Sequence, residues 1–223
     1  MINLPFDVIG EYCARFSTPA DDILNALERE THLKTIAPQM LAGAHQGRFL
    51  QMLSTLLQPE RILEIGSFTG YSAICFARGL KPGGIIDTIE FDPEYSVLFN
   101  KYVAQAGLSD RIKLHNGDAR VILKGLKGPY DLVFIDAGKR EYPEYYEAAV
   151  NKTKKGGLIL LDNMLWDGKV PENIDDEEAN VLRALAKTIL NDTRVECVLL
   201  PLRDGIMLVR KAKAEAKAKK NKS

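Results

Sequence analysis

The sequence predicts a doubly wound α/β fold built on a mostly parallel sheet, and three observations predict it. Five short apolar segments alternate with helical segments along residues 61–190, which is the pattern of βαβ units. Two of these segments, LVFI and LILL, are apolar without alternation, as in strands that helices cover on both faces. Two further apolar segments flank Arg203-Asp204-Gly205, where the Asp-Gly pair predicts a hairpin turn. We therefore expect right-handed parallel crossovers and an antiparallel hairpin at the end of the sheet.

Helices are expected before the sheet, over residues 7–58. The segment PADDILNALERE has Asp21 and Asp22 near its start and apolar residues at helical spacing after them. Pro38 ends this region, and AHQGRFLQMLSTLL predicts a second helix that stops before Pro59. These helices form an N-terminal lead-in to the α/β core.

The expected strands determine where a ligand would bind. In doubly wound sheets, ligands lie beyond the carboxyl ends of the parallel strands. The residues that end the strands are therefore the candidate functional residues, and nearly all of them are acidic. The expected strands are 61–66, 84–90, 111–115, 130–136 and 157–162, with hairpin strands at 194–202 and 205–211, and the expected helices between them begin near Tyr71, Pro93, Ala119, Tyr142 and Asp175.

The bulk composition predicts one domain with a charged end. A chain of 223 residues with 46% hydrophobic content can bury one core. We divide it into a helical lead-in (1–58), the core (59–211) and a basic tail (212–223). The last fourteen residues carry seven Lys/Arg and one Glu, so the other 209 hold 23 bases against 29 acids. We interpret the tail as a solvated end, with a handle for nucleic acid as the alternative.

Cysteine usage and hydropathy predict a cytoplasmic protein. Cys13, Cys75 and Cys197 are odd in number, widely spaced and form no CxxC pair, which indicates reduced thiols. No run of about eighteen apolar residues occurs, so we expect no membrane span. The N-terminal segment also lacks the basic start and apolar stretch of a signal peptide.

A glycine-rich turn, EIGSFTG (64–70), follows the first expected strand, where a dinucleotide fingerprint would lie. The first glycine of that fingerprint is replaced by Glu64, and a carboxylate there would repel a pyrophosphate. A cationic adenosine ligand without phosphate, such as S-adenosylmethionine, fits better. Gly66 would let the backbone approach it, and Ser72, near a helix start, could hold its carboxylate.

Two acids at the next strand ends strengthen the case for a nucleoside. Glu90 lies 20 residues after Gly70, where an acid usually binds a ribose diol. Asp118, with Ala119 beside it, follows the third strand and is placed to meet an adenine edge. Each acid alone would more simply be a helix cap or a solvated turn. Their coincidence with the glycine turn favours nucleoside binding.

Three oxygen donors end the fourth and fifth strands. Asp136 ends one strand, and Asp162 and Asn163 end the next. If these strands are neighbours, the two carboxylates would repel each other unless a cation lay between them. Oxygen ligands favour Mg²⁺, with Mn²⁺ or Ca²⁺ as other fits. The competing interpretation is an aspartate that caps the following helix.

Side chains near these donors complete the candidate site. Lys139 follows Asp136 by three residues, and beside a cation it could accept a proton from a hydroxyl; a solvated lysine is the alternative. Trp166 could form a wall against an aromatic substrate ring. We expect Tyr142 and its neighbours Tyr145 and Tyr146 to pack against the sheet.

The motifs together resemble one family. LEIGSFTGYSA, IEFDPE, FIDAGKREYPEYY, GGLILLDNMLWDGKV and LPLRDGIMLVRK, in this order, resemble the cation-dependent O-methyltransferases. That family includes caffeoyl-CoA and catechol O-methyltransferases and small bacterial relatives, and the resemblance runs from about Met40 to Lys211. It implies a seven-stranded methyltransferase sheet, S-adenosylmethionine as methyl donor, and a homodimer.

The resemblance also implies residue roles. It makes Asp136, Asp162 and Asn163 the metal ligands and Lys139 the general base. One position departs from the pattern, because the family commonly reads Asp-Ala-Asp-Lys where this chain has Asp-Ala-Gly-Lys, with Gly138 in place of the second acid. The cofactor-binding positions that it implies are Met40, Ala42, Glu64, Gly66, Ser72, Glu90, Asp118, Ala119 and Asp136.

The predicted function is metal-dependent transfer of a methyl group to one hydroxyl of a catechol-like vicinal dihydroxy aromatic. The alternative is methylation of a hydroxylated uridine in tRNA, for which the basic tail would be useful. An NAD-dependent dehydrogenase is disfavoured by Glu64. A nucleoside-binding module without catalysis would not need three metal-type ligands.

Overall fold

The computed structural model describes residues 6–212. These residues form two compact units, which divide between Ala119 and Arg120. The seven strands form one mixed sheet, in the order β3 (Ile112–Asn116), β2 (Ile85–Glu90), β1 (Arg61–Ile65), β4 (Tyr130–Ile135), β5 (Thr153–Leu161), β7 (Ile206–Lys211) and β6 (Val195–Leu200). The doubly wound fold class is therefore confirmed. Residues 213–223, nearly all of the predicted basic tail, lie outside the described residues. The division into lead-in, core and tail stays a prediction.

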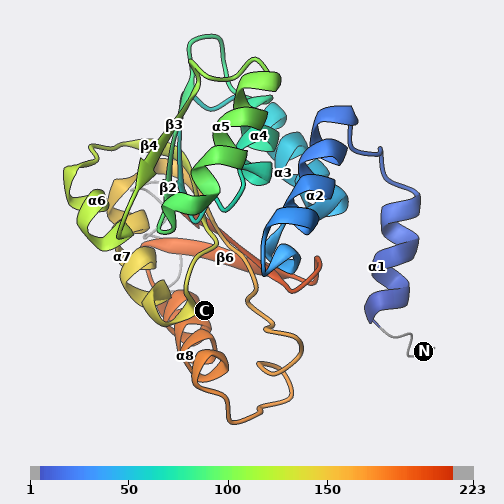
Figure 1. The fold of residues 1–223 in the computed structure, drawn as a ribbon. Helices are drawn as coiled ribbons and strands as arrows, with labels where there is room; N and C mark the ends of the chain where they lie inside the picture. The colour runs from blue at the N-terminus through green and yellow to red at the C-terminus, as the bar shows by residue number, and fades with distance from the viewer. Residues whose placement is uncertain (1–5, 213–223) are drawn as a thin grey trace. The chain divides into compact units, whose positions relative to one another are not determined.

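The first unit places helices before three parallel strands. In Figure 1, α1 stands beside α2 and α3, which precede β1. β1 pairs in parallel with β2, and β2 with β3, so their carboxyl ends lie at one edge. Its elements are α1 (Phe6–Arg15), α2 (Asp22–Lys34), α3 (Gly43–Leu57), β1 (Arg61–Ile65), α4 (Tyr71–Ala77), β2 (Ile85–Glu90), α5 (Ser96–Gln105) and β3 (Ile112–Asn116).

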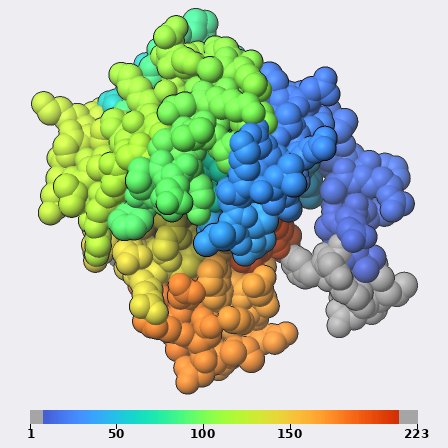
Figure 2. Space-filling view, viewed as in Figure 1, coloured from blue at the N-terminus to red at the C-terminus, as the bar shows by residue number. Residues whose placement is uncertain are grey.

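The lead-in helix α2 is capped by the side chain of Asp21 and anchored by a tyrosine of α5. Asp21 accepts a hydrogen bond from Leu24 N at 3.1 Å, which is the N-cap that the acidic pair predicts. At the other end, Tyr102 of α5 donates from its hydroxyl to Ala26 O at 3.0 Å, and it also lies 2.6 Å from Glu30 Oε2. These bonds join α2 to α5, and the two surfaces adjoin in Figure 2.

Gly79 lies where the chain after α4 passes the backbone of α3. An alanine Cβ at this position would lie 2.3 Å from Thr55 N and 2.5 Å from Ser54 Oγ. Because backbone atoms cannot move aside, Gly79→Ala is expected to lower the free energy of unfolding by about 1–3 kcal/mol. Urea denaturation measures this change. The control is Gly125→Ala, whose Cβ would meet nothing within 4 Å, and equal losses in the two variants would contradict the packing argument.

The second unit contains two parallel strands and the predicted hairpin. β4 pairs in parallel with β5, whereas β7 pairs in antiparallel fashion with both β5 and β6. The hairpin turn at Arg203-Asp204-Gly205 is confirmed, and α7 and α8 pack together beside the strands (Figure 1). The elements are α6 (Ala119–Gly125), β4 (Tyr130–Ile135), α7 (Tyr142–Lys152), β5 (Thr153–Leu161), α8 (Glu177–Asn191), β6 (Val195–Leu200) and β7 (Ile206–Lys211).

The pairing of β4 with β5 is irregular at one end and regular at the other. Tyr130 pairs with Thr153, but the next pair joins Leu132 to Leu158. From there the register is continuous to Ile135 opposite Leu161. β5 therefore begins at Thr153, four residues before the expected start, and the polar residues Lys154 and Lys155 belong to it.

Most other boundaries agree with the expectation within two residues. β4 and β5 each end one residue earlier than expected, so Asp136 and Asp162 are the first residues after their strands. The expected helix at Pro93 is a 3₁₀ turn, Pro93–Tyr95, followed by α5. Among residues 6–212, none of the helices combines the length and the apolar character needed to cross a membrane.

Candidate active site

The glycine-rich turn after β1 is shaped by backbone conformations that favour glycine. Gly66 and Gly70 have φ values of 94° and 93°, in the region that side chains disfavour. A Cβ at Gly70 would also lie 2.8 Å from Phe99 Cδ2. Gly66 N donates to Ile89 O at 2.9 Å, which fixes the turn against the end of β2. The turn is therefore tightly built, with Ser67, Thr69 and Gly70 buried and Gly66 partly exposed.

Glu90 is the residue that ties this turn to β2. Its Oε2 accepts from Phe68 N at 2.6 Å and its Oε1 accepts from Asp92 N at 3.0 Å. Burial raises the pKa of Glu90 above its usual value, and these two backbone bonds oppose that shift. Each carboxylate oxygen has a second lone pair, so Glu90 can still accept a hydrogen bond from a diol.

Two hydroxyls beside the turn were missed by the sequence reading. Ser67 Oγ and Tyr71 OH are buried and have no hydrogen-bond partner within residues 6–212. Buried polar atoms normally find a partner, so these two are available to a bound ligand. Only the position of Ser67 inside the glycine turn could have indicated it. The expected Ser72 is also buried, in the first turn of α4.

The remaining cofactor candidates of the first unit differ in exposure. Glu64 is fully buried in β1 and accepts a 2.5 Å hydrogen bond from Thr88 Oγ1 on the paired strand. Ala42 is buried at the start of α3, whereas Met40 is 47% exposed. Asp118 is partly exposed after β3, and the buried Ala119 begins α6.

Asp136 and Asp162 leave the ends of two paired strands. Ile135 and Leu161 are register partners, and Asp162 N donates to Ile135 O at 3.0 Å. The carboxylate of Asp136 is partly exposed, while Asp162 is completely buried. Sequence reasoning required that the fourth and fifth strands be neighbours, and that condition is met.

Asn163 supplies the third oxygen donor of this edge. Its φ of 56° places it in the left-handed region, and its backbone N donates to Asp162 Oδ1 at 2.8 Å. Within residues 6–212 no group of three or more His, Cys, Asp or Glu side chains could hold a metal. A cation at this edge would have the amide oxygen of Asn163 beside the two carboxylates. Such an all-oxygen donor set fits a hard divalent ion.

Lys139 lies at the same edge and is buried rather than solvated, with 6% of its surface exposed. Its Nζ lies 3.2 Å from Asp136 Oδ1 and donates to Tyr142 OH at 2.7 Å. The ammonium also lies 5.7 Å from the centroid of the Trp166 ring. The interpretation of Lys139 as a solvated lysine is therefore wrong. The predicted substrate wall, Trp166, and the predicted base thus share one location.

Tyr142 has a polar role that its helical position did not reveal. Its buried hydroxyl lies 3.2 Å from Ile135 O and 3.1 Å from Asp162 O, at the ends of β4 and β5. Burial raises the pKa of Tyr142 well above its ordinary value, and the charges of Asp136 and Asp162 raise it further. The phenol therefore stays protonated and joins both strand ends to Lys139. The ring is packed as expected, but the hydroxyl is part of the site.

Gly138, the position that departs from the family pattern, is not required by the backbone. Its φ of −55° is accessible to any residue. A Cβ there would lie 2.7 Å from Glu141 Oε2, the flexible end of a side chain. The carboxylate of Glu141 thus lies beside position 138, where the family commonly has an aspartate.

Comparisons with known proteins identify the family of the chain. Residues 14–212 match the model of the O-methyltransferase family. A catechol O-methyltransferase of Niastella koreensis is 33% identical over 207 residues, covering 91% of this chain and 93% of the relative. A probable caffeoyl-CoA O-methyltransferase of Dictyostelium discoideum is 36% identical over 210 residues, covering 91% of both chains.

A solved structure shares the fold over nearly the whole chain. The O-methyltransferase TomG from Streptomyces achromogenes, solved in complex with SAM, superposes with a TM-score of 0.84 at 29% identity. The superposition covers 92% of this chain and 96% of TomG. With the family model matched over most of the sequence, the chain belongs to the O-methyltransferase family.

Proposed function

We propose that the protein transfers a methyl group from S-adenosylmethionine to one hydroxyl of a catechol-like vicinal dihydroxy aromatic, with a divalent cation. The observation that carries the proposal is that Asp136 and Asp162 follow register-paired residues of β4 and β5. The acceptor class is supported by the names of the relatives, which are catechol and caffeoyl-CoA O-methyltransferases. The methyl donor is supported by the SAM bound to TomG.

Asp136, Asp162 and Asn163 would hold the cation, with Mg²⁺ as the expected ion and Mn²⁺ or Ca²⁺ as other fits. When bound, the cation would act as a Lewis acid that orients the two vicinal hydroxyls of the substrate and makes one of them more acidic. Lys139 would act as a neutral amine, which would accept the hydroxyl proton at Nζ and so become an ammonium. Trp166 would lie against the substrate ring. The buried position of Lys139 keeps its amine close to Asp136.

The donor would lie at the glycine turn. Gly66 and Ser67 would admit and contact it, Glu90 would accept from its ribose, and Ser72 would hold its carboxylate at the start of α4. The orphaned hydroxyl of Ser67 fits such a ligand. The other positions of the first unit proposed to bind it are Met40, Ala42, Glu64, Asp118 and Ala119.

A homodimer and a cytoplasmic location belong to the same proposal, and both stay predictions. Methylation of a hydroxylated uridine in tRNA is a further arm of the test. The protein is incubated with labelled S-adenosylmethionine, Mg²⁺ and either a dihydroxyphenol panel or bulk tRNA, each with a chelator control. The proposal is supported if the dihydroxyphenols become labelled without chelator and are not labelled when chelator is added. Equal labelling with excess chelator would refute the metal role, and labelling of tRNA alone would refute the acceptor.

The hydroxyl of Tyr142 gives a test of how Lys139 is held. Tyr142→Phe removes the 2.7 Å bond from Lys139 Nζ and leaves the ring in place. The free energy of unfolding is expected to fall by about 1–3 kcal/mol, because buried partners lose a hydrogen bond. We expect kcat to fall about tenfold because Lys139 is held less accurately. A tenfold fall corresponds to an increase of only about 1.4 kcal/mol in the activation free energy. Tyr145→Phe is the matched control, and an equal loss of kcat there would contradict the role of Tyr142.

A further inference from the structure

We propose that Asp204, in the hairpin turn between β6 and β7, is a positioning residue that orients the amide of Asn163 toward the cation. The inference rests on the proposed metal role of Asn163. The sequence predicts only a turn at Arg203-Asp204-Gly205, which any Asp-Gly pair could make. In the folded chain, the carboxylate of Asp204 also makes hydrogen bonds outside the turn, to Asn163 and Asp167.

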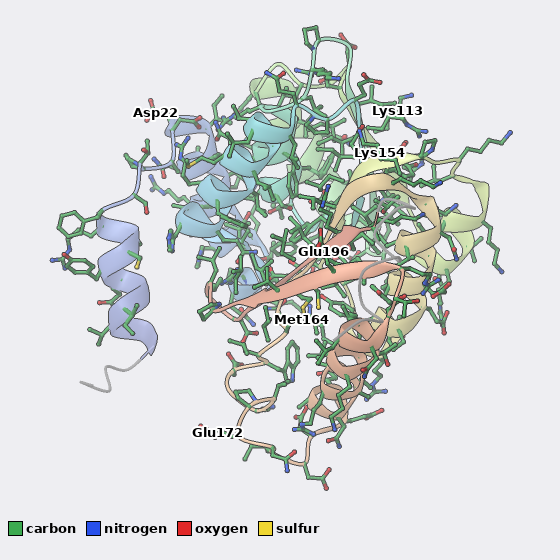
Figure 3. The ribbon with its side chains drawn as sticks, turned by 180° about the vertical axis from the view of Figure 1, so that it is seen from behind. Asp22, Lys113, Lys154, Met164, Glu172 and Glu196 are labelled. Atoms are coloured by element: carbon green, nitrogen blue, oxygen red, sulfur yellow. The ribbon has the colours of Figure 1, made fainter. Side chains whose placement is uncertain are left out.

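The turn is joined to the segment after β5 by four hydrogen bonds. Two come from side-chain oxygens, because Asp204 Oδ2 accepts from Asn163 Nδ2 at 3.0 Å and Oδ1 accepts from Asp167 N at 2.7 Å. Two are made by the backbone, from Leu165 N to Asp204 O and from Met164 N to Gly205 O, both at 2.9 Å. In Figure 3, Met164 accordingly lies beside β6 and β7, whereas Glu172 is at the far end of its segment.

The chemistry of an amide makes the first of these bonds directional. The side chain of Asn163 has a donor end, Nδ2, and an acceptor end, Oδ1. An ionised carboxylate can only accept, so Asp204 selects the donor end and leaves Oδ1 for another partner. A cation needs the oxygen, so the carboxylate of Asp204 favours the orientation that binds metal. Partners that orient ligands in this way are a regular part of metal sites.

Gly205 explains how the turn comes so close. Its φ of 86° lies in the region that favours glycine. A Cβ at this position would lie 2.5 Å from Leu165 Cγ and 3.1 Å from Leu165 N. A larger residue would therefore push the turn away from Leu165. The Asp-Gly pair thus serves two purposes, since glycine permits the approach and aspartate makes the bond.

The test measures metal binding directly. Mn²⁺ is the probe, and its free concentration is followed by electron paramagnetic resonance during titration of the intact protein. Asp204→Ala is expected to weaken Mn²⁺ binding about 10–100-fold, the usual effect of removing an orienting partner. Binding of S-adenosylmethionine without metal is measured in parallel. It is expected to stay unchanged, because no cofactor position is altered.

A matched control separates orientation from loop anchoring. Asp176 is another carboxylate at the end of the same segment, where it accepts from Lys169 Nζ at 2.8 Å and caps α8 through Ala179 N at 3.0 Å. Asp176→Ala loosens the segment without touching Asn163. We expect its Mn²⁺ affinity to match that of the unaltered protein. An equal loss in both variants would show anchoring only and overturn the proposal.

A reciprocal exchange keeps the proposal testable if Asp204→Ala fails to fold. Asn163→Asp alone sets two carboxylates against each other and is expected to weaken Mn²⁺ binding. Adding Asp204→Asn supplies a hydrogen-bond donor to the new carboxylate. The double variant is expected to bind Mn²⁺ at least tenfold more tightly than Asn163→Asp alone, a difference of about 1.4 kcal/mol. If the double variant binds no better than Asn163→Asp, the proposal is wrong. If the unaltered protein binds no Mn²⁺ at all, the metal role of the whole site fails instead.

Discussion

Replacing Asp136 by alanine is expected to reduce kcat/KM for catechol methylation by about a thousandfold, while most of the affinity for S-adenosylmethionine remains. The size follows from the several kcal/mol that a bound cation supplies and from 1.4 kcal/mol per tenfold in rate. Asp136 directly follows Ile135, the residue paired with Leu161, so its loss removes one of two carboxylates at that edge. Initial rates with labelled donor and a separate calorimetric titration of the donor measure the two effects.

The control for this variant comes from the same strand. Asp131 lies near the other end of β4, where it is paired with Lys154. Asp131→Ala removes an aspartate of the same strand without approaching the site, and we expect the rate to be unchanged. A fully active Asp136→Ala enzyme, or one that is inactive because it no longer binds the donor, would contradict the assignment of Asp136 as a metal ligand.

Replacing Lys139 by methionine is expected to lower kcat about 10²–10⁴-fold, the usual range for losing a general base. Methionine keeps an unbranched apolar side chain but lacks the amine nitrogen that lies 4.6 Å from the ring centroid of Tyr142 and 5.7 Å from that of Trp166. Removing the ammonium also frees Asp136 Oδ1 from its 3.2 Å contact, so the affinity for Mn²⁺ is expected to be equal or higher. Rapid-quench measurement of a single turnover isolates the chemical step.

A surface lysine in the same unit is the control for this second variant. Lys169 Nζ is paired with Asp176 Oδ2 at 2.8 Å, so Lys169→Met removes an ion pair of the same type that does not involve Asp136. Its single-turnover rate should equal that of the unaltered enzyme. If Lys139→Met keeps full kcat, the proton goes elsewhere and the lysine only balances the charge of Asp136.

The fold could be predicted in large part because strand ends carry strong local signals. Apolar runs that stop at Gly, Asp or Glu placed Asp136 and Asp162 within one residue of the observed ends. The start of β5 could not be found in this way. Lys154 and Lys155 are polar and exposed, and only pairing in the folded sheet makes them part of a strand.

The candidate site was predictable at its charged residues but not at the groups that hold them. An acid at a strand end stands out in a sequence, whereas Tyr142 has the same helical spacing as a tyrosine that only packs. Its hydroxyl meets Ile135 O and Asp162 O because β4 and β5 are neighbours, and that contact depends on the folded chain. Asp204 was read correctly as a turn, and its bond to Asn163 spans 41 residues that no local pattern connects.

Because the pairing is irregular at the start of β5, a change in chain length there need not move Asp162 at the other end of the strand. Between the pairs Tyr130–Thr153 and Leu132–Leu158, β5 has four residues where β4 has one. Insertions or deletions in related chains at this end would change the size of that bulge and leave the pairs from Leu132 to Ile135 in register. A one-residue slip beyond Leu158, by contrast, would turn Asp162 to the opposite face of the sheet. Homologous sequences should therefore vary in length before Leu158 and hold a constant spacing from there to Asp162.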